Sequence, residues 1–168
     1  MNTPSFSFRP ARARDQSFLE QMLLEAANAS GNTLTLATLT GDEHTYRYVA
    51  RWGRSSDIGV VAVDEHGARA GAAWARMFDA ATGSPAYLGA GIPEITIAVA
   101  PAFRRHGLGA ALLRKLADHA RGAGAAGLSL GVHMNNVAAQ QLYRDDGWSV
   151  HHTAGYYSVL FKDLCPAT

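Results

Sequence analysis

The chain has 168 residues, of which 48% are hydrophobic and 17% charged, and its mean hydropathy is −0.07. This composition supplies a buried core and excludes intrinsic disorder as the main state, because disorder requires low hydrophobicity or a high net charge. Its 15 basic and 14 acidic residues give a formal net charge of +1, without the concentrated basic surface that is typical of nucleic-acid-binding proteins.

Membrane and disulfide-rich classes are also excluded. No apolar run approaches the roughly 18 residues of a membrane-spanning helix, and residues 1–20 lack the apolar segment of a signal peptide. The only cysteine, Cys165, excludes an internal disulfide and a cysteine metal cluster. We therefore expect one globular, cytoplasmic domain over residues 1–168, with no metal and no nucleic-acid or membrane partner.

The first third of the chain predicts one strand and two helices. Residues 5–9 alternate polar and apolar side chains up to Pro10, which is typical of a strand. A helix is predicted from Asp15, with one buried face formed by Phe18, Leu19, Met22, Leu23 and Ala26. Residues 29–41 are rich in Thr, Asn and Gly and show no period, and residues 44–54 predict a short helix.

The rest of the chain alternates strands with two helices. Strands are predicted at 58–63, 69–78, 92–100, 128–133, 148–152 and 156–162, helices at 107–121 and 136–146, and a long loop at 79–91. The strand–helix–strand unit over 92–133 has the length of a parallel crossover. The sequence therefore predicts an α+β (mixed α/β) fold, with a mostly antiparallel sheet that contains one parallel pair.

A short basic turn, Arg104-Arg-His-Gly107-Leu-Gly109, joins the strand at 92–100 to the helix that follows. The first amides of a helix lack internal partners and carry partial positive charge. Glycines leave such amides accessible and the arginines add charge, so the turn is predicted to bind phosphate. A dinucleotide-binding fingerprint would require glycine where Leu112 stands, and the Gly-Lys-Ser/Thr triplet of a Walker A loop is absent.

The helix predicted at 136–146 carries a second polar pattern. Asn136 and Tyr143 are seven residues apart and share a face, with the small Ala139 between them, which suits a ligand lying across the helix. Leu142 and Ala138 point to another side, which we assign to the core.

Together these two segments resemble the GCN5-related N-acetyltransferase (GNAT) superfamily. Residues 104–110, after a β-branched strand and a proline, resemble its Arg/Gln-x-x-Gly-x-Gly/Ala loop, which binds the pyrophosphate of acetyl-CoA. Residues 136–148 resemble its Asn-x-x-Ala-x-x-Leu-Tyr-x-x-x-Gly-Phe segment, with Trp148 in place of phenylalanine. The resemblance covers residues 58–162 and implies a twisted mixed sheet of about seven strands with a central parallel pair, flanked by about four helices.

The resemblance implies an acyltransferase that moves an acetyl group from acetyl-CoA directly to a primary amine of a small molecule or peptide, in a ternary complex. It makes Tyr143 the general acid that protonates the departing thiolate. The residues that it places at the cosubstrate are Ile97, Ala98, Val99, Arg104, Arg105, His106, Gly107, Leu108, Gly109, Ala110, Asn136, Ala139 and Tyr143. Family members often form homodimers, whereas the sequence itself indicates no oligomeric state.

Glu94 is the predicted proton acceptor, with a structural role at the strand end as the alternative. This carboxylate enters a strand that is otherwise apolar, which is costly unless the group is hydrogen-bonded or used. In family members an acid at this place often takes the proton of the amine, directly or through water. His133, at the end of the next strand, is the alternative base. The oxyanion formed by attack needs a donor such as a strand amide freed by a bulge.

Two other functions remain open on the sequence alone. One is a non-catalytic acyl-CoA-binding or sensing module, which needs no base, and the other is a mononucleotide-binding protein that uses the same helix terminus. The sequence offers four aromatic residues and the loop at 79–91 for an acceptor pocket; the aromatic residues are Tyr46, Tyr48, Trp52 and Trp74. No dense acidic cluster indicates a polycationic acceptor.

Overall fold

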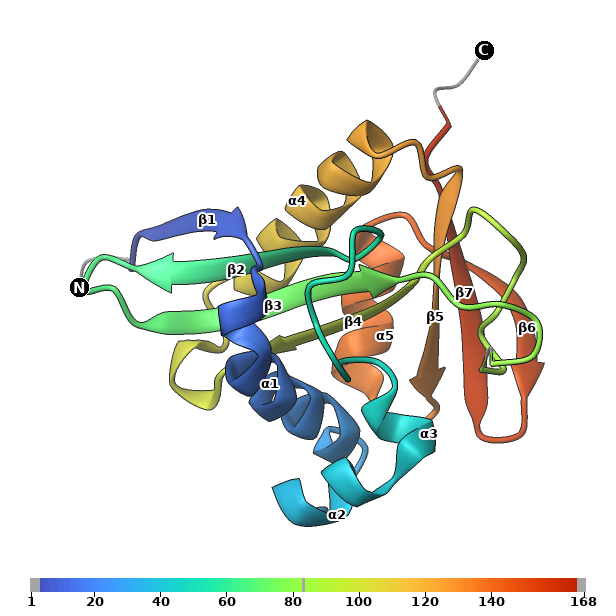
Figure 1. Cartoon of the computed structure of the whole chain (residues 1–168), viewed down its shortest axis with the longest axis horizontal. Coiled ribbons are helices and arrows are strands. Elements are labelled where there is room, and N and C mark those ends of the chain that lie inside the picture. Colours follow the sequence, from blue (N-terminus) through green and yellow to red (C-terminus); the bar gives the residue numbers. More distant parts are fainter. Residues whose placement is uncertain (1–3, 83, 166–168) are drawn as a thin grey trace.

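A twisted sheet of seven strands runs through the computed structural model, which describes residues 4–82 and 84–165 (Figure 1). The strands are β1 (Phe6–Pro10), β2 (Ile58–Asp64), β3 (Arg69–Arg76), β4 (Glu94–Val99), β5 (Gly127–His133), β6 (Ser149–Ala154) and β7 (Tyr157–Asp163). They are ordered β1-β2-β3-β4-β5-β7-β6, and β4 and β5 are parallel while the other neighbours are antiparallel. The predicted α+β fold with one parallel pair is confirmed.

The described residues form five α-helices, one more than expected. They are α1 (Gln16–Asn28), α2 (Leu36–Gly41), α3 (Glu43–Tyr46), α4 (Leu108–Gly122) and α5 (Val137–Asp145). The additional helix is α2, which lies in the segment that showed no period and is capped by the Thr35 side chain. The helix predicted over 44–54 is wrong in length, because it ends at Tyr46 and the chain continues in turns, with Arg51 in the left-handed region at φ 52°. Among the described residues, we find no helix with the length and apolarity that crossing a membrane demands.

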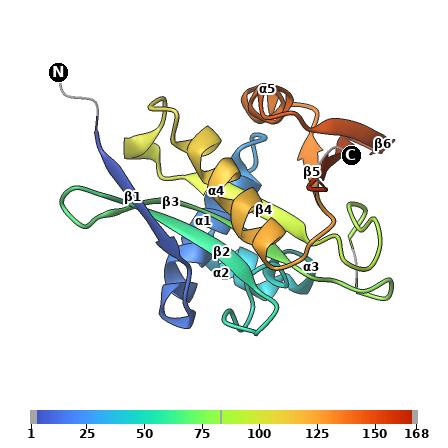
Figure 2. The same cartoon turned by 90° about the horizontal axis from the view of Figure 1, so that it is seen from above.

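Helices cover both faces of the sheet (Figure 2). Helix α4 packs Leu112, Leu113 and Leu116 against one face of β2–β4, and Tyr143 of α5 belongs to the same hydrophobic cluster. Helix α1 packs its predicted apolar face on the opposite side, where Leu19 lies with Trp74 of β3. Each face of the central strands is therefore buried against a different helix layer.

The sheet opens at its parallel pair. Strands β4 and β5 match at one position, Glu94 with Ser129, and beyond it they diverge toward their carboxyl ends (Figure 1). By contrast, β4 pairs with β3 without interruption from Glu94 to Val99. The second half of β4 thus has a partner strand on one edge and none on the other.

Candidate active site

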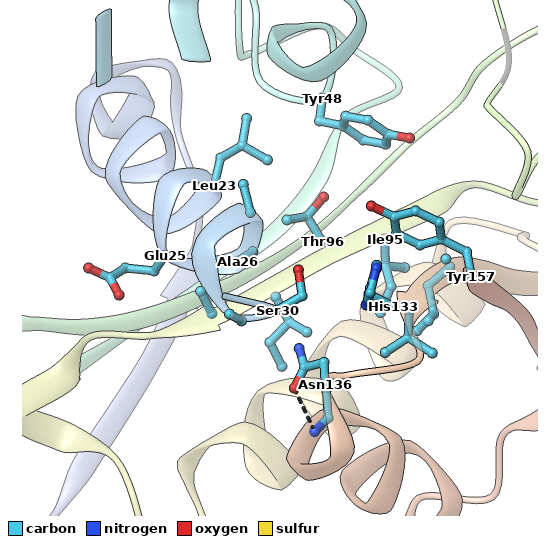
Figure 3. Close-up of a pocket in the computed structure, with 18 of the residues that line it drawn as sticks. Leu23, Glu25, Ala26, Ser30, Tyr48, Ile95, Thr96, His133, Asn136 and Tyr157 are labelled. Carbon is cyan, nitrogen blue, oxygen red and sulfur yellow. Dashed lines mark hydrogen bonds between the residues drawn. The ribbon is translucent and has the colours of Figure 1, made fainter. Parts of the chain in front are cut away.

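The gap between β4 and β5 is part of a cleft of about 690 Å³. It reaches from the C-terminal half of α1 and the turns after α3, across β4, to the N-terminal ends of α4 and α5 (Figure 3). Ile97, Val99, Gly109, Asn136 and Tyr143 all line it. The two sequence segments that suggested a ligand site therefore border one continuous cavity.

The free edge of β4 presents backbone groups to this cleft. The amide of Ala100 donates to the carbonyl of Ala70 at 2.9 Å, so it points toward β3. Because amides alternate in direction along a strand, those of Ile97 and Val99 point the other way, toward the gap. The Val99 carbonyl also points there and accepts a hydrogen bond from Arg104 Nε at 3.1 Å. These amides are freed because β4 and β5 diverge, whereas β4 pairs with β3 from Glu94 to Val99 without a bulge.

The N-terminus of α4 carries a run of unpaired amides. Within residues 4–82 and 84–165, no acceptor takes a hydrogen bond from the backbone amides of residues 105–110. Gly107 is the N-cap, in the left-handed region at φ 73°, and a Cβ there would meet open space. At Gly109 a Cβ would lie 3.2 Å from Leu142 Cδ2, so this glycine lets α4 approach α5 closely. The amides and the helix dipole make this terminus a suitable anion site.

The basic residues of the turn differ in their surroundings. Arg104 is half exposed, and its guanidinium pairs with Glu25 of α1 at 2.7 Å. Arg105, with φ 65°, and His106 are both exposed. Arg104 therefore ties the turn to α1, while Arg105 and His106 extend from the turn into solvent.

Helix α5 presents both predicted polar residues to the cleft. Asn136 is its N-cap, and its side-chain oxygen accepts a hydrogen bond from the Ala139 amide at 3.2 Å (Figure 3). Its side-chain NH₂ group remains available to a ligand. The core assignment of Ala138 is wrong, since this residue is exposed and lines the cleft. Leu142 is half-buried and packs against the core, as expected.

Tyr143 is buried, and its ring packs on Trp148 with 5.7 Å between ring centroids. Burial raises the pKa of its hydroxyl, with no other cause contributing. No hydrogen bond joins this hydroxyl to the described residues, and Tyr143 lines the cleft. A phenol with a raised pKa keeps its proton at neutral pH, so it can act as a donor there.

Glu94 is 5% exposed and is surrounded by hydroxyl donors. Tyr48 donates to Oε1 at 2.6 Å, and Ser84 lies 2.6 Å from both carboxylate oxygens. Burial raises the pKa of Glu94, while the hydrogen bonds from Ser84 and Tyr48 and the charge of Arg47 oppose this rise. A carboxylate with a raised pKa is a stronger base than an exposed one.

His133 also lines the cleft, but its ring is engaged. Nδ1 accepts a hydrogen bond from the Asn135 amide at 3.1 Å, and the ring packs against Tyr156 and Tyr157 with centroid distances of 6.1 Å and 5.1 Å. These contacts place the end of β5 beside the turn of the β6–β7 hairpin. Of Glu94 and His133, we therefore favour Glu94 as the base, because burial raises its pKa.

Of the four aromatic residues suggested for an acceptor pocket, Tyr48 lines the cleft. Tyr46 instead donates to Glu20 at 2.7 Å, and Trp52 and Trp74 are buried in the core beneath α1. The loop at 79–91 contributes Ser84, Pro85 and Ala86 to the lining. Ser84 was missed as an individual residue, because only the folded loop brings it back to a carboxylate ten residues further on.

Glu94 and Tyr143 approach the gap from opposite faces of the sheet. Glu94 shares its side of β4 with Ala98, which packs against the cluster beneath α1, whereas Tyr143 belongs to the cluster beneath α4. Between them lies the free edge of β4 with its inward-pointing amides. A buried carboxyl group and a buried phenol thus flank a row of backbone amides.

The sequence matches the Acetyltransferase (GNAT) family over residues 21–148. Because the match covers most of the chain, this protein belongs to that family, and it is an acyltransferase. No curated protein matches it.

Solved structures of the same fold extend over nearly the whole chain. The yncA protein of Salmonella typhimurium, solved with its cofactor acetyl-CoA, has a TM-score of 0.70 at 21% identity, covering 98% of this chain and 96% of its own. The PaiA N-acetyltransferase of Thermoplasma acidophilum, in complex with coenzyme A, has a TM-score of 0.70 at 16% identity, covering 95% and 99%. A GCN5-related N-acetyltransferase from Kribbella flavida has a TM-score of 0.67 at 23% identity, covering 94% and 97%.

Proposed function

We propose that this protein is an acetyl-CoA-dependent N-acetyltransferase that transfers the acetyl group directly to a primary amine in a ternary complex. The observation that carries the proposal is the placement of Glu94 and Tyr143 on opposite faces of the gap between β4 and β5. Direct transfer requires a base within reach of the amine and an acid within reach of the departing thiolate, both at the same acyl carbon. The cleft offers such a pair, with a base on one side and an acid on the other.

The cosubstrate is proposed to lie along the α4 and α5 side of the cleft. The unpaired amides of residues 105–110 suit its diphosphate, and the cleft-facing amides of Ile97 and Val99 suit the pantetheine arm, which would add to the edge of β4 like a strand. Asn136 retains its side-chain NH₂ group for this arm, and Ala139 leaves space beside it. Arg105 adds positive charge at the rim, and both Arg105 and His106 add N–H donors there.

The residues then act in sequence. Glu94 takes a proton from the incoming ammonium, whose reference pKa near 10 leaves it protonated at neutral pH. The cleft-facing amides of β4 stabilise the oxyanion that forms on attack. Tyr143 protonates the departing thiolate, so no covalent enzyme intermediate is required. A homodimer and a cytoplasmic location stay predictions from the sequence.

Comparison of two glycines that flank α4 tests the cosubstrate site. Gly107 and Gly124, at opposite ends of the helix, have φ of 73° and 84°, and a Cβ at either would meet open space. Alanine at either position should cost about 1–2 kcal/mol of backbone strain. We expect Gly107→Ala to weaken acetyl-CoA binding at least tenfold more than Gly124→Ala in calorimetry.

The same comparison can refute the proposal. Equal losses of acetyl-CoA affinity in both variants would show that the N-terminus of α4 does not hold the cosubstrate. A panel of amines, followed by CoA release, tests the reaction itself. Binding of acetyl-CoA without release of CoA for any amine would instead favour the acyl-CoA-binding module, and binding of ATP in preference to CoA would favour a mononucleotide site.

A further inference from the structure

Glu94 has little direct access to the cleft, because two hydroxyl groups cover its carboxylate. Oε1 accepts from Tyr48 at 2.6 Å, and Ser84 lies 2.6 Å from both oxygens, while the residue is 5% exposed. Tyr48 is one of these two donors, and it lines the cleft together with Glu94. We propose that the Tyr48 hydroxyl stands between the acceptor amine and Glu94 and relays the proton, an inference that rests on the proposed function.

Tyr48 fits the relay better than Ser84 does. A relay hydroxyl must donate to the base and accept from the amine at the same time. The Ser84 hydroxyl already accepts a hydrogen bond from the Ala86 amide at 3.0 Å. The single Ser84 hydrogen is also shared with Tyr48, because a hydrogen bond from Ser84 lowers the pKa of the Tyr48 hydroxyl. Tyr48 donates its own hydrogen to Glu94, and its oxygen has a second lone pair that can accept from the amine.

Two ring contacts and one backbone hydrogen bond hold Tyr48 in place. It packs edge-to-face on Phe78 at a centroid distance of 5.3 Å, and the Arg47 guanidinium lies 5.5 Å from its centroid. Its backbone carbonyl accepts a hydrogen bond from Trp74 Nε1 at 2.9 Å. Figure 3 shows Tyr48 near Thr96 of β4, with Tyr157 and His133 lining the same region of the cleft. Such a fixed hydroxyl is preorganised for proton transfer.

The proton balance is simple. The ammonium N–H bond breaks as its proton passes to the Tyr48 oxygen, and the Tyr48 O–H bond breaks as its own proton passes to Glu94 Oε1. The amine nitrogen retains the electron pair that attacks the thioester. Tyr48 is unchanged at the end of the step, and Glu94 becomes a neutral carboxylic acid that later returns the proton to water.

The groups around Glu94 set its pKa, and the Tyr48 hydroxyl is one of them. Burial raises the pKa of Glu94, and the hydrogen bonds from Ser84 and Tyr48 and the positive charge of Arg47 oppose this rise. Arg76, opposite Glu94 on β3, is paired with Asp57 at 2.8 Å, and β5 contributes the neutral Ser129 at the matching position. Removal of the Tyr48 hydroxyl should therefore raise the pKa of Glu94, because a hydrogen bond to the charged form is lost.

Tyr48→Phe and Ser84→Ala form a matched pair of tests, since each removes one hydrogen bond from Glu94. Both should move the acidic limb of the kcat/KM profile to higher pH. We expect Tyr48→Phe also to lower the limiting kcat/KM about 100-fold, within the range for general-base catalysis, while Ser84→Ala lowers it less than about threefold. A protein with 3-fluorotyrosine at position 48 keeps the hydroxyl and should retain the limiting rate.

A double-mutant cycle decides whether Tyr48 acts through Glu94. On a Glu94→Gln background, Tyr48→Phe should cause no further loss, because the relay has no acceptor. Additive losses, or a Tyr48→Phe variant with the wild-type limiting rate, would overturn the relay while the proposed function stands. Failure of the wild-type protein to release CoA with any amine, despite binding acetyl-CoA, would overturn both.

Discussion

Tyr143 allows stability and catalysis to be separated by removal of one oxygen atom. Its hydroxyl makes no hydrogen bond within the described part of the chain, and its ring contact with Trp148 is unaffected by a change to phenylalanine. Since a hydrogen bond contributes about 0.5–1.5 kcal/mol, Tyr143→Phe should change the free energy of unfolding by less than about 0.5 kcal/mol. Loss of the proton donor should lower kcat about 100-fold.

Tyr46→Phe is the matched control. The Tyr46 hydroxyl donates to Glu20 at 2.7 Å and accepts from Gln16 at 3.1 Å, away from the cleft. Its removal should cost about 1 kcal/mol and lower Tm by about 2–4 °C in a chain of this size. We expect kcat in this variant to stay at the wild-type value.

Steady-state CoA release, acetyl-CoA calorimetry and thermal unfolding measure the three quantities separately. The affinity for acetyl-CoA should be nearly the same in both variants and the wild type. A wild-type kcat in Tyr143→Phe would remove this residue from the acid role. A large loss of stability in Tyr143→Phe would show that its hydroxyl has a structural partner, contrary to the observed geometry.

Two further predictions concern buried charges. Burial raises the pKa of Glu94, so the folded state binds the carboxyl proton more tightly than the unfolded state does. The stability that results from this difference is complete below the ordinary pKa of 4.5. It is lost as pH rises through the raised pKa of the folded state. Glu94→Gln should therefore gain stability relative to wild type between pH 4 and pH 8 in denaturant unfolding, and a constant difference would contradict the assignment. Asp57→Ala leaves Arg76, with 1% of its side chain exposed, without its carboxylate partner; this should cost about 3–5 kcal/mol, and a loss below about 1 kcal/mol would refute the argument.

Long periodic elements of this fold could be predicted from sequence, and short ones could not. Helix α4 and the strands from β2 onward carry patterns long enough to define their type. Helix α2 has six residues, fewer than two turns, so no apolar period can develop, and its start depends on the side chain of Thr35. After α3 the chain runs in turns, and these turns place Val49 and Trp52 in the core. The two residues are spaced as on one face of a helix, although no helix forms there.

The site residues also fall into those that could be predicted from sequence and those that could not. Asn136 and Tyr143 lie at the cleft because residues seven apart share a helix face whatever the helix packs on. The position of Ala138 could not be predicted, because helical spacing does not reveal which face meets a cleft instead of a sheet. Ser84 reaches Glu94 through a loop fold, and no local pattern encodes such a contact. Patterns specify neighbours within an element, while contacts between elements depend on the tertiary fold.

The divergence of β4 from β5 has a consequence for the lifetime of the polypeptide. A strand edge with unused backbone groups is a site where a foreign strand can add, which exposes an empty molecule to aggregation. On the proposed function, the acyl donor occupies this edge, and a ligand at 100 times its Kd adds about 2.7 kcal/mol to the free energy of unfolding. The concentration of the acyl donor would then set the stability of the folded protein against aggregation, as well as its rate of catalysis.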